Sequence, residues 1–214
     1  MPTSRTLVLS AWEPEVAPLR RLLRAAPAAR ARAVALEAVG VGTVDAAVGA
    51  TAAIARARPA RVIFVGTAGV YPSAARAFPI GVATVAGELR LVSTATLRGD
   101  AYHPAPLVAS AEPSVALSAG LARGASPRAR APVACPLAIT RTAALARRIA
   151  ATGAALENLE AFAVARAAAA ARLPFAAVLG VSNIVGPRAH AEWRANHLAA
   201  SRAACHLMWT FLNA

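Results

Sequence analysis

Short unbroken apolar runs alternate along the chain with stretches in which apolar residues recur at helical spacing. The runs at 6–10, 33–39 and 61–65 predict three strands, of which the first suits a strand buried on both faces. Between them, the spacing of apolar residues over 16–23 and the segment 44–57 predict two helices. Strand–helix–strand spacing of this kind predicts parallel strands joined by helical crossovers.

The second half of the chain continues the alternation. It predicts strands at 82–92 (broken at Gly87-Glu88), 133–139 and 175–181, and helices from 140–142 to about 151, from about 160 to 172 and from 189 to 213. Periodicity fades between 93 and 132, which favours a long loop over the functional site. We therefore expect one domain over residues 1–214, of the α/β class, with three α/β/α layers and a mixed, largely parallel central sheet.

The chain is strongly basic, and the distribution of the charge decides what this means. It has 214 residues, of which 57% are hydrophobic, and a net charge of +13. Every basic residue is an arginine, and the arginines are scattered through Ala-rich segments without a basic patch interleaved with aromatic residues. This pattern indicates a codon bias, and we expect no nucleic-acid partner.

Cysteine usage and the N-terminus bear on the cellular compartment. Cys135 and Cys205 lie far apart in apolar surroundings without a C-x-x-C pair, which predicts two buried, reduced thiols and no metal site. The N-terminus runs directly into the first apolar run and does not read as a signal peptide. Apolar runs are too short to span a membrane, so we expect a cytoplasmic protein without a membrane partner.

Polar side chains stand at the ends of three predicted strands. Glu15 follows the first strand, Thr67 follows the third, and Ser182 and Asn183 follow the strand that begins near residue 175. Carboxyl ends of parallel strands share one edge of a sheet, and open α/β sheets bind ligands there. We expect these groups to meet at one site, which Glu160 joins from the preceding helix.

Other polar residues have simpler explanations. The segment Gly40-Val41-Gly42-Thr43 resembles a phosphate cradle, but it lacks the third glycine, the Walker lysine and a nearby arginine, so a tight turn fits equally well. Thr43 is expected to cap the helix that follows. Glu13 is explained by the helix dipole, and His103 by an exposed loop position rather than by a role as a base.

The residue types at the strand ends suit cleavage of an N-glycosidic bond. A carboxylate such as Glu15 can deprotonate a water molecule as a general base. A second carboxylate such as Glu160 can hold the ribose hydroxyls in an oxocarbenium-like transition state. A donor such as Asn183 can stabilise the departing base at its N7 atom. Residue type matches these roles, although spacing alone does not assign them.

Four segments carry a resemblance to a known family. They are AWEPEV (11–16), VGVGTVDAAVGAT (39–51), VIFVGTAGVY (62–71) and ENLEAFAVA…LPF…VSNIVGPR (157–188). Together they resemble the nucleoside phosphorylase and nucleosidase superfamily, and most closely its futalosine hydrolase branch. The segments cover most of the chain in the family's order, and the run that ends at Arg188, with Trp193 beyond it, also looks like that branch.

The resemblance implies a role for each matching residue. The last glutamate of the first segment activates the water molecule in related nucleosidases, and that position falls on Glu15. The glutamate that binds the ribose hydroxyls falls on Glu160, with Leu159 as its apolar neighbour under the sugar. The family's G-S-A-G segment falls on Gly66 to Gly69, so Thr67, Ala68 and Gly69 are candidate substrate-binding residues. Homo-oligomerisation, often as a dimer, is also implied, and no cofactor or metal is.

Two departures from the family's pattern affect the expected chemistry. Adenine-specific nucleosidases have Ser-Asp where this chain has Ser182-Asn183. An Asn amide can donate to N7 and to a 6-oxo oxygen, which favours hypoxanthine or guanine and hence futalosine over methylthioadenosine. Related nucleosidases usually have an arginine where this chain has Leu179; Arg188 is a candidate substitute from the next turn. Glu157 is expected in a surface or supporting role.

The nucleophile distinguishes a hydrolase from a phosphorylase. A phosphorylase needs arginines in its Gly-rich loop to hold phosphate, and residues 39–47 contain none. Water is therefore the expected nucleophile, and the resemblance implies a hydrolase that cleaves a 6-oxopurine nucleoside, futalosine, in menaquinone biosynthesis. Two alternatives stay open: a 5'-methylthioadenosine/S-adenosylhomocysteine-type nucleosidase, and a nucleoside-binding homologue with weak or no catalysis. The 5' substituent of the nucleoside, the oligomeric state, and the function of residues 93–132 are not fixed by the sequence.

Overall fold

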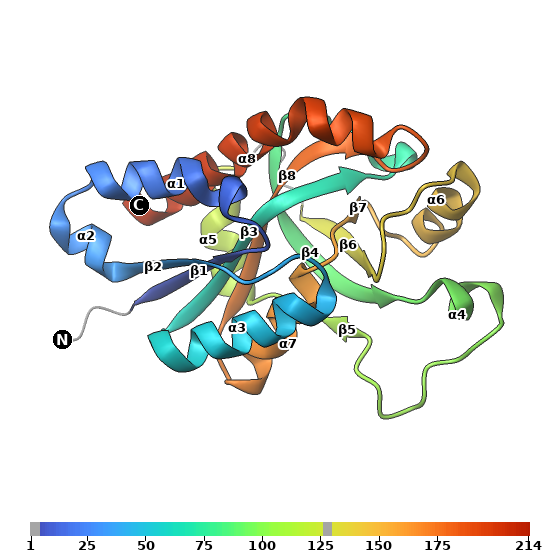
Figure 1. Cartoon of the computed structure of the whole chain (residues 1–214), viewed down its shortest axis with the longest axis horizontal. Helices are drawn as coiled ribbons and strands as arrows, with labels where there is room; N and C mark the ends of the chain where they lie inside the picture. The colour runs from blue at the N-terminus through green and yellow to red at the C-terminus, as the bar shows by residue number, and fades with distance from the viewer. Residues whose placement is uncertain (1–4, 126–129) are drawn as a thin grey trace.

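The computed structural model describes residues 5–125 and 130–214. Figure 1 shows a central twisted sheet with helices on both sides. The strands are β1 Thr6–Ser10, β2 Val34–Ala38, β3 Arg61–Val70, β4 Ala83–Val92, β5 Ser110–Ala111, β6 Ala131–Pro136, β7 Leu156–Glu157 and β8 Phe175–Ile184. The helices are α1 Glu13–Ala25, α2 Ala28–Ala33, α3 Thr43–Ala57, α4 Thr94–Arg98, α5 Val115–Ala122, α6 Ala143–Ala150, α7 Ala161–Ala170 and α8 Ala189–Asn213, with a short 3-10 turn at Pro72–Ala74.

The sheet is mixed and largely parallel, as the sequence predicted. Strands β2, β1, β3 and β8 lie side by side and run parallel, and β6 runs parallel to both β4 and β7. The pairs β4–β8, β3–β7 and β4–β5 are antiparallel. Because β3 pairs with both β8 and β7, the strands β3, β8, β4, β6 and β7 close into a ring, which the sequence pattern did not predict.

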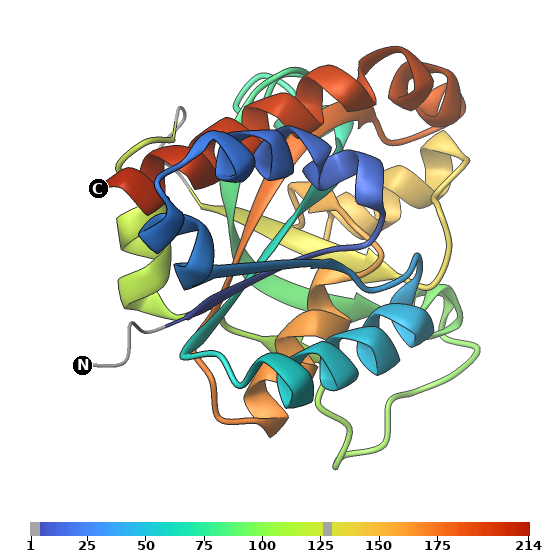
Figure 2. The ribbon, with the colours of Figure 1, turned by 60° about the vertical axis from the view of Figure 1, so that its left-hand side comes forward.

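Helices cover both faces of the sheet. Figures 1 and 2 show α1 and α8 packed together on one face and α3 with α7 on the other. On α1, apolar residues at helical spacing, Val16, Leu19 and Leu23, are buried in the same core cluster as Cys205 and Met208 of α8. Three layers in one domain confirm the expected fold class.

Two strands of the structure extend further toward the C-terminus than the sequence predicted. β3 continues through the small-residue segment 66–69 to Val70, and β8 continues through Ser182 and Asn183 to Ile184. β4 is also continuous across Gly87-Glu88, where its pairing with β6 shifts register. Polar and small residues predicted to lie in loops are therefore fixed on strands, because neighbouring strands satisfy their backbone groups.

The segment predicted to be a long loop is partly structured. It contains α4, β5 and α5, and Ser93 and Ser114 cap the two helices by accepting from backbone N–H groups of Thr96 and Leu117. The aperiodic sequence concealed these short elements, and residues 126–129 of the predicted loop lie outside the described residues. His103 lies in the irregular part and does not line the cleft described below.

The cysteines behave as predicted. Cys135 and Cys205 are buried and free, and burial raises the pKa of each thiol to about 12. Within the described residues, no helix is both long enough and apolar enough to cross a membrane.

Candidate active site

A cleft of about 390 Å³ lies at the carboxyl ends of β1, β3 and β8, where α1, α7 and α8 begin. Its volume is in the range of small-molecule sites. Its polar and aromatic lining consists of Trp12, Glu15, Thr67, Glu157, Asn158, Glu160, Ser182, Asn183, His190 and Trp193. Its apolar lining consists of Ala11, Val41, Ala68, Gly69, Ile139, Leu159 and Ala189.

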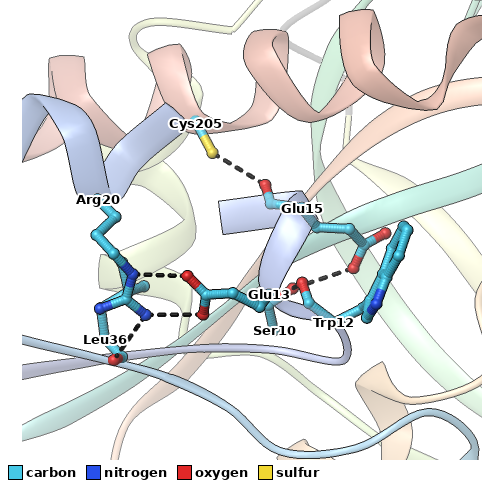
Figure 3. Close-up of polar contacts among 7 residues, drawn as sticks. All are labelled: Ser10, Trp12, Glu13, Glu15, Arg20, Leu36 and Cys205. Atoms are coloured by element: carbon cyan, nitrogen blue, oxygen red, sulfur yellow. Dashed lines mark hydrogen bonds and ion pairs between the residues drawn. The ribbon is translucent and has the colours of Figure 1, made fainter. Parts of the chain in front are cut away.

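Glu15 projects from the first turn of α1 into this cleft and is buried. Ser10, the last residue of β1, donates to Glu15 Oε2 at 3.0 Å. The backbone N–H and the hydroxyl of Thr67 both donate to Glu15 Oε1, at 2.9 and 2.6 Å. Figure 3 shows the contrast with Glu13, which turns away to pair with Arg20 outside the cleft. Glu13 lies in the first turn of α1 and outside the cleft, which fits the explanation of this residue by the helix dipole.

Burial dominates the electrostatics of Glu15. Desolvation raises the pKa of the carboxyl above its ordinary value, although hydrogen bonds from Thr67 and Ser10 and the charge of His197 oppose the rise. A carboxylate with a raised pKa is a stronger base than an exposed one, so this environment suits proton abstraction near neutral pH.

Trp193 of α8 extends the hydrogen bonds around Glu15. Its indole N–H donates to Thr67 Oγ1 at 3.3 Å, so the Thr67 hydroxyl receives one bond and gives one to the carboxylate. The ring stacks on His197 at 4.4 Å and lies 5.9 Å from His190 and 6.0 Å from Trp12, measured between centroids. The sequence did not predict this contact, because helical spacing alone does not reveal a hydrogen bond to a residue 126 positions away.

Glu160 is the residue immediately before α7 and is also buried. Gly42 N donates to Glu160 Oε1 at 2.9 Å, and desolvation is the main cause that raises the pKa of this carboxyl. Thr43 Oγ1 donates to Leu159 O at 2.9 Å. Thr43 therefore ties the β2–α3 loop to the Glu160 segment and does not cap α3, which corrects the predicted capping role.

Asn158 holds the segment that carries Glu160, a role that was not predicted from residue type or spacing. Its Nδ2 donates to Thr67 O at 3.0 Å, and its Oδ1 accepts from the backbone N–H groups of Glu160 and Ala161. The side chain thus joins the strand that supplies Thr67 to the start of α7. This one amide sets the spacing between the Glu15 and Glu160 ends of the cleft.

Glu157 is buried and does not lie on the surface. Tyr71 Oη donates to Glu157 Oε2 at 2.7 Å, and Thr140 N donates to Oε1 at 3.0 Å. Both carboxylate oxygens therefore have partners. This fits the expected supporting role of Glu157, and the expectation of a surface position was wrong. Burial, together with the charge of Glu157, raises the pKa of Tyr71, so the phenol stays protonated as the donor.

Asn183 faces the cleft from the end of β8. Ser182 Oγ donates to Asn183 Oδ1 at 2.8 Å, and Asn183 Nδ2 donates to Ile184 O at 3.2 Å. A Cβ atom on Gly69 would lie 2.9 Å from Asn183 Nδ2, so the glycine makes room for this amide. Because the Ile184 carbonyl can only accept, it identifies Nδ2 as the atom beside it, and the second N–H of Nδ2 is left as a donor.

The cleft brings together nearly all residues that the sequence proposed for the site. Those that line it are Glu15, Glu160, Asn183, Thr67, Ala68, Gly69, Leu159 and Ser182. Arg188 does not: its side chain is 86% exposed and pairs with Glu192 at 3.2 Å. Position 179 is occupied by a leucine that is fully buried in the core. Neither position 179 nor Arg188 therefore supplies a guanidinium group to the cleft. Within residues 5–125 and 130–214, no group of three His, Cys, Asp or Glu side chains is placed to hold a metal ion.

Comparison with known families assigns the class of the chain. The profile of the phosphorylase superfamily matches residues 8–213, so the protein belongs to this superfamily. A comparison with curated protein sequences finds no significant match.

Solved structures share the whole fold at low sequence identity. The futalosine hydrolase of Helicobacter pylori is 14% identical, with a TM-score of 0.84 over 99% of this chain and 98% of that one. A 5'-methylthioadenosine/S-adenosylhomocysteine nucleosidase from the same organism is also 14% identical, with a TM-score of 0.84 over 100% and 99% of the two chains. The corresponding nucleosidase from Neisseria meningitidis is 18% identical, with a TM-score of 0.82 over 97% and 98%.

Proposed function

We propose that the protein is an N-ribosyl hydrolase that releases hypoxanthine, a 6-oxopurine, from futalosine in menaquinone biosynthesis. The observation that carries this proposal is the meeting of Glu15, Glu160 and Asn183 in one cleft. These residues lie far apart in the sequence, and each supplies a group that cleavage of an N-glycosidic bond requires. The fold shared with a futalosine hydrolase and with two nucleosidases supports the reaction class.

Glu15 activates the water molecule. Its carboxylate accepts from Ser10 and Thr67, which hold it in one orientation, while its raised pKa keeps it a competent base. It removes a proton from water as the oxygen approaches the anomeric carbon of the ribose. The bond to the purine breaks, and its electron pair leaves with the base.

Glu160 binds the ribose. Gly42 donates to one of its oxygens, and the carboxylate retains lone pairs that can accept bonds from sugar hydroxyls. A negative charge beside the sugar stabilises the oxocarbenium character of the transition state, because positive charge develops on the ring there. Leu159 supplies an apolar contact beside it.

Asn183 recognises the base. Because only one N–H of Asn183 Nδ2 is used by the Ile184 carbonyl, the second N–H is left to donate into the cleft. A 6-oxopurine presents acceptors at N7 and O6, which match a donor, whereas the 6-amino group of adenine needs an acceptor. This pairing supports futalosine over an adenine nucleoside.

Water, rather than phosphate, is the nucleophile. The Gly42 N–H, which a phosphate cradle would require, is occupied by Glu160, and no arginine lines the cleft within the described residues. Three carboxylates, Glu15, Glu157 and Glu160, line it instead and would repel an anion.

Homo-oligomerisation of the cytoplasmic enzyme stays a prediction, and one surface feature supports it. Val44 and Val48 of α3 are 72% and 68% exposed, Val41 just before the helix is 60% exposed, and Ile139 is 57% exposed. Val41 and Ile139 also line the cleft. A second subunit on this face would cover these side chains and narrow the mouth of the site.

The test is to incubate the protein separately with futalosine, inosine and methylthioadenosine and to quantify the free base. Hypoxanthine released from futalosine alone supports the proposal. Adenine released from methylthioadenosine instead would identify an adenine nucleosidase, for which the shared fold with such enzymes is the supporting observation. Binding without release would identify a nucleoside-binding homologue.

A further inference from the structure

A second cavity, of about 530 Å³, lies at the opposite end of the parallel strands from the cleft. Thr6, Val34 and Arg61, the first residues of β1, β2 and β3, line it. The C-terminal part of α8 forms another wall through Phe211 and Leu212. The cavity therefore shares no lining residue with the cleft, although β3 and α8 contribute residues to both.

Three arginines line this cavity: Arg30, Arg61 and Arg123. Arg30 donates to Asn213 Oδ1, and Arg61 Nε donates to Thr6 Oγ1 at 2.7 Å. In the described part of the chain, no ion pair joins any of the three guanidinium groups to a carboxylate. Their remaining N–H groups and three positive charges are thus available to an anion.

The cavity also has an apolar side that is fixed in place. The guanidinium carbon of Arg61 lies 5.4 Å from the centroid of the Phe211 ring, in a cation–π contact. A Cβ atom on Gly120 of α5 would lie 2.9 Å from Phe211 Cε2, so the ring is packed closely on that helix. The other apolar residues that line the cavity are Pro27, Ala29, Ala33, Val34, Leu212 and Ala214.

We propose that this cavity binds a small phosphate monoester that carries a flat apolar group. The guanidinium groups bind the phosphate through bidentate, charge-assisted hydrogen bonds, and the apolar group packs beside Phe211 and Leu212. The catalytic cleft has the opposite character, since its lining bears three carboxylates and no arginine among the described residues. An anionic ligand therefore prefers the arginine cavity over the cleft.

Phenyl phosphate is a suitable probe, because it has both features and is not a nucleoside. Isothermal titration at low salt should show one saturable site, and binding should weaken as salt is added. Arg123→Gln is the principal variant: Arg123 is exposed and its guanidinium makes no hydrogen bond in the described structure, so the fold is preserved. Each of Arg123→Gln and Arg61→Gln should weaken binding by about tenfold or more.

Three controls separate this site from general charge and from the cleft. Arg166→Gln removes the same charge from an exposed position on α7 and should leave binding unchanged. Asn183→Ala alters the cleft and should also leave it unchanged. Inorganic phosphate should bind more weakly than phenyl phosphate, because it does not reach the apolar wall.

The proposal is overturned if phenyl phosphate does not bind, if it binds no better than inorganic phosphate, or if Arg166→Gln weakens it as much as Arg123→Gln. It is also overturned if Asn183→Ala abolishes binding. Release of base from nucleosides by the Arg123→Gln variant should equal that of the unaltered protein. Failure of this proposal therefore leaves the proposed hydrolase function untouched.

Discussion

The two ends of the cleft hold their carboxylates in different ways. At the α1 end, Glu15 accepts hydrogen bonds on both oxygens, and the bonds continue through Thr67 to Trp193. At the α7 end, Glu160 Oε1 accepts from Gly42 N of the β2–α3 loop. The first arrangement suits a carboxylate that takes one proton, and the second leaves acceptor capacity for sugar hydroxyls, as the proposed mechanism requires. Desolvation raises the pKa of both carboxyls, so the two ends differ in their hydrogen-bond partners and not in the direction of the shift.

Replacing the fixed carboxylate gives the largest expected effect. Glu15→Gln should lower kcat by roughly 10²–10⁴-fold, because it removes the general base while keeping the side-chain volume. KM for the nucleoside should change little, since Glu15 acts on water. Steady-state release of base measures both constants.

Glu13→Gln is the matched control for this variant. Glu13 lies two residues away in the same helix and pairs with Arg20 outside the cleft. Its substitution should leave kcat within about twofold, because exposed ion pairs contribute little. Equal losses in the two variants would contradict the assignment of the base.

The ribose end should respond in a different way. Glu160→Gln should lower kcat/KM by roughly 10²-fold or more, because it removes charge where positive charge develops in the transition state. It should also reduce the preference for a ribonucleoside over its 2'-deoxy analogue, which Glu15→Gln should retain. Comparing both substrates in both variants tests the division of roles.

In the proposed function, the specificity for the base depends on the amide of Asn183. Asn183→Asp should lower cleavage of the 6-oxopurine nucleoside and raise that of an adenine nucleoside, a combined change of about 10–100-fold in relative kcat/KM. A protonated Asp donates to N7 and still accepts from a 6-amino group. An unchanged ratio between futalosine and methylthioadenosine would remove Asn183 from base recognition.

Substitution of Trp193 tests the hydrogen bonds that extend from Glu15 through Thr67, and its expected effect on kcat is smaller. Trp193→Phe keeps an aromatic ring beside His197 but loses the donor to Thr67, and should lower kcat by up to about tenfold. Because the Thr67 hydroxyl is then less firmly held toward Glu15, the acidic limb of the pH profile should move to higher pH. A lower kcat with an unmoved limb would assign Trp193 a packing role only.

Glu15→Gln should raise the thermal stability of the protein although it lowers the activity. The folded pKa of Glu15 is raised above its ordinary value of 4.5, so the unfolded chain loses this proton first as pH rises, and the free energy of unfolding falls. Glu15→Gln should therefore raise the Tm near neutral pH. The gain should shrink toward pH 4.5 and below it, where both states hold the proton. Thermal unfolding of both proteins across pH measures this.

How far the sequence predicted the molecule depends on the range of the interactions involved. Apolar runs and helical spacing correctly predicted β1, β8 and α8, and both strands are buried over almost their whole length. The extension of β3 through Gly69 was missed, because pairing with β7 and β8, and not local propensity, decides it.

The same limit applies to the site. Glu15, Glu160 and Asn183 were proposed from residue type and resemblance, and the structure brings them into one cleft. Asn158 and Ser10 were missed, because each acts through one contact with a partner that residue type does not reveal. Arg188 was proposed as a substitute cation, but its pairing with Glu192 one turn along α8 keeps it at the surface.

The most direct test of the account is cleavage of futalosine in H₂¹⁸O with inorganic phosphate present. The account predicts free hypoxanthine and a sugar product that carries one ¹⁸O atom at the anomeric carbon, at a rate independent of phosphate, with both products lost in Glu15→Gln. A sugar 1-phosphate without ¹⁸O, or no hypoxanthine at all, would contradict it.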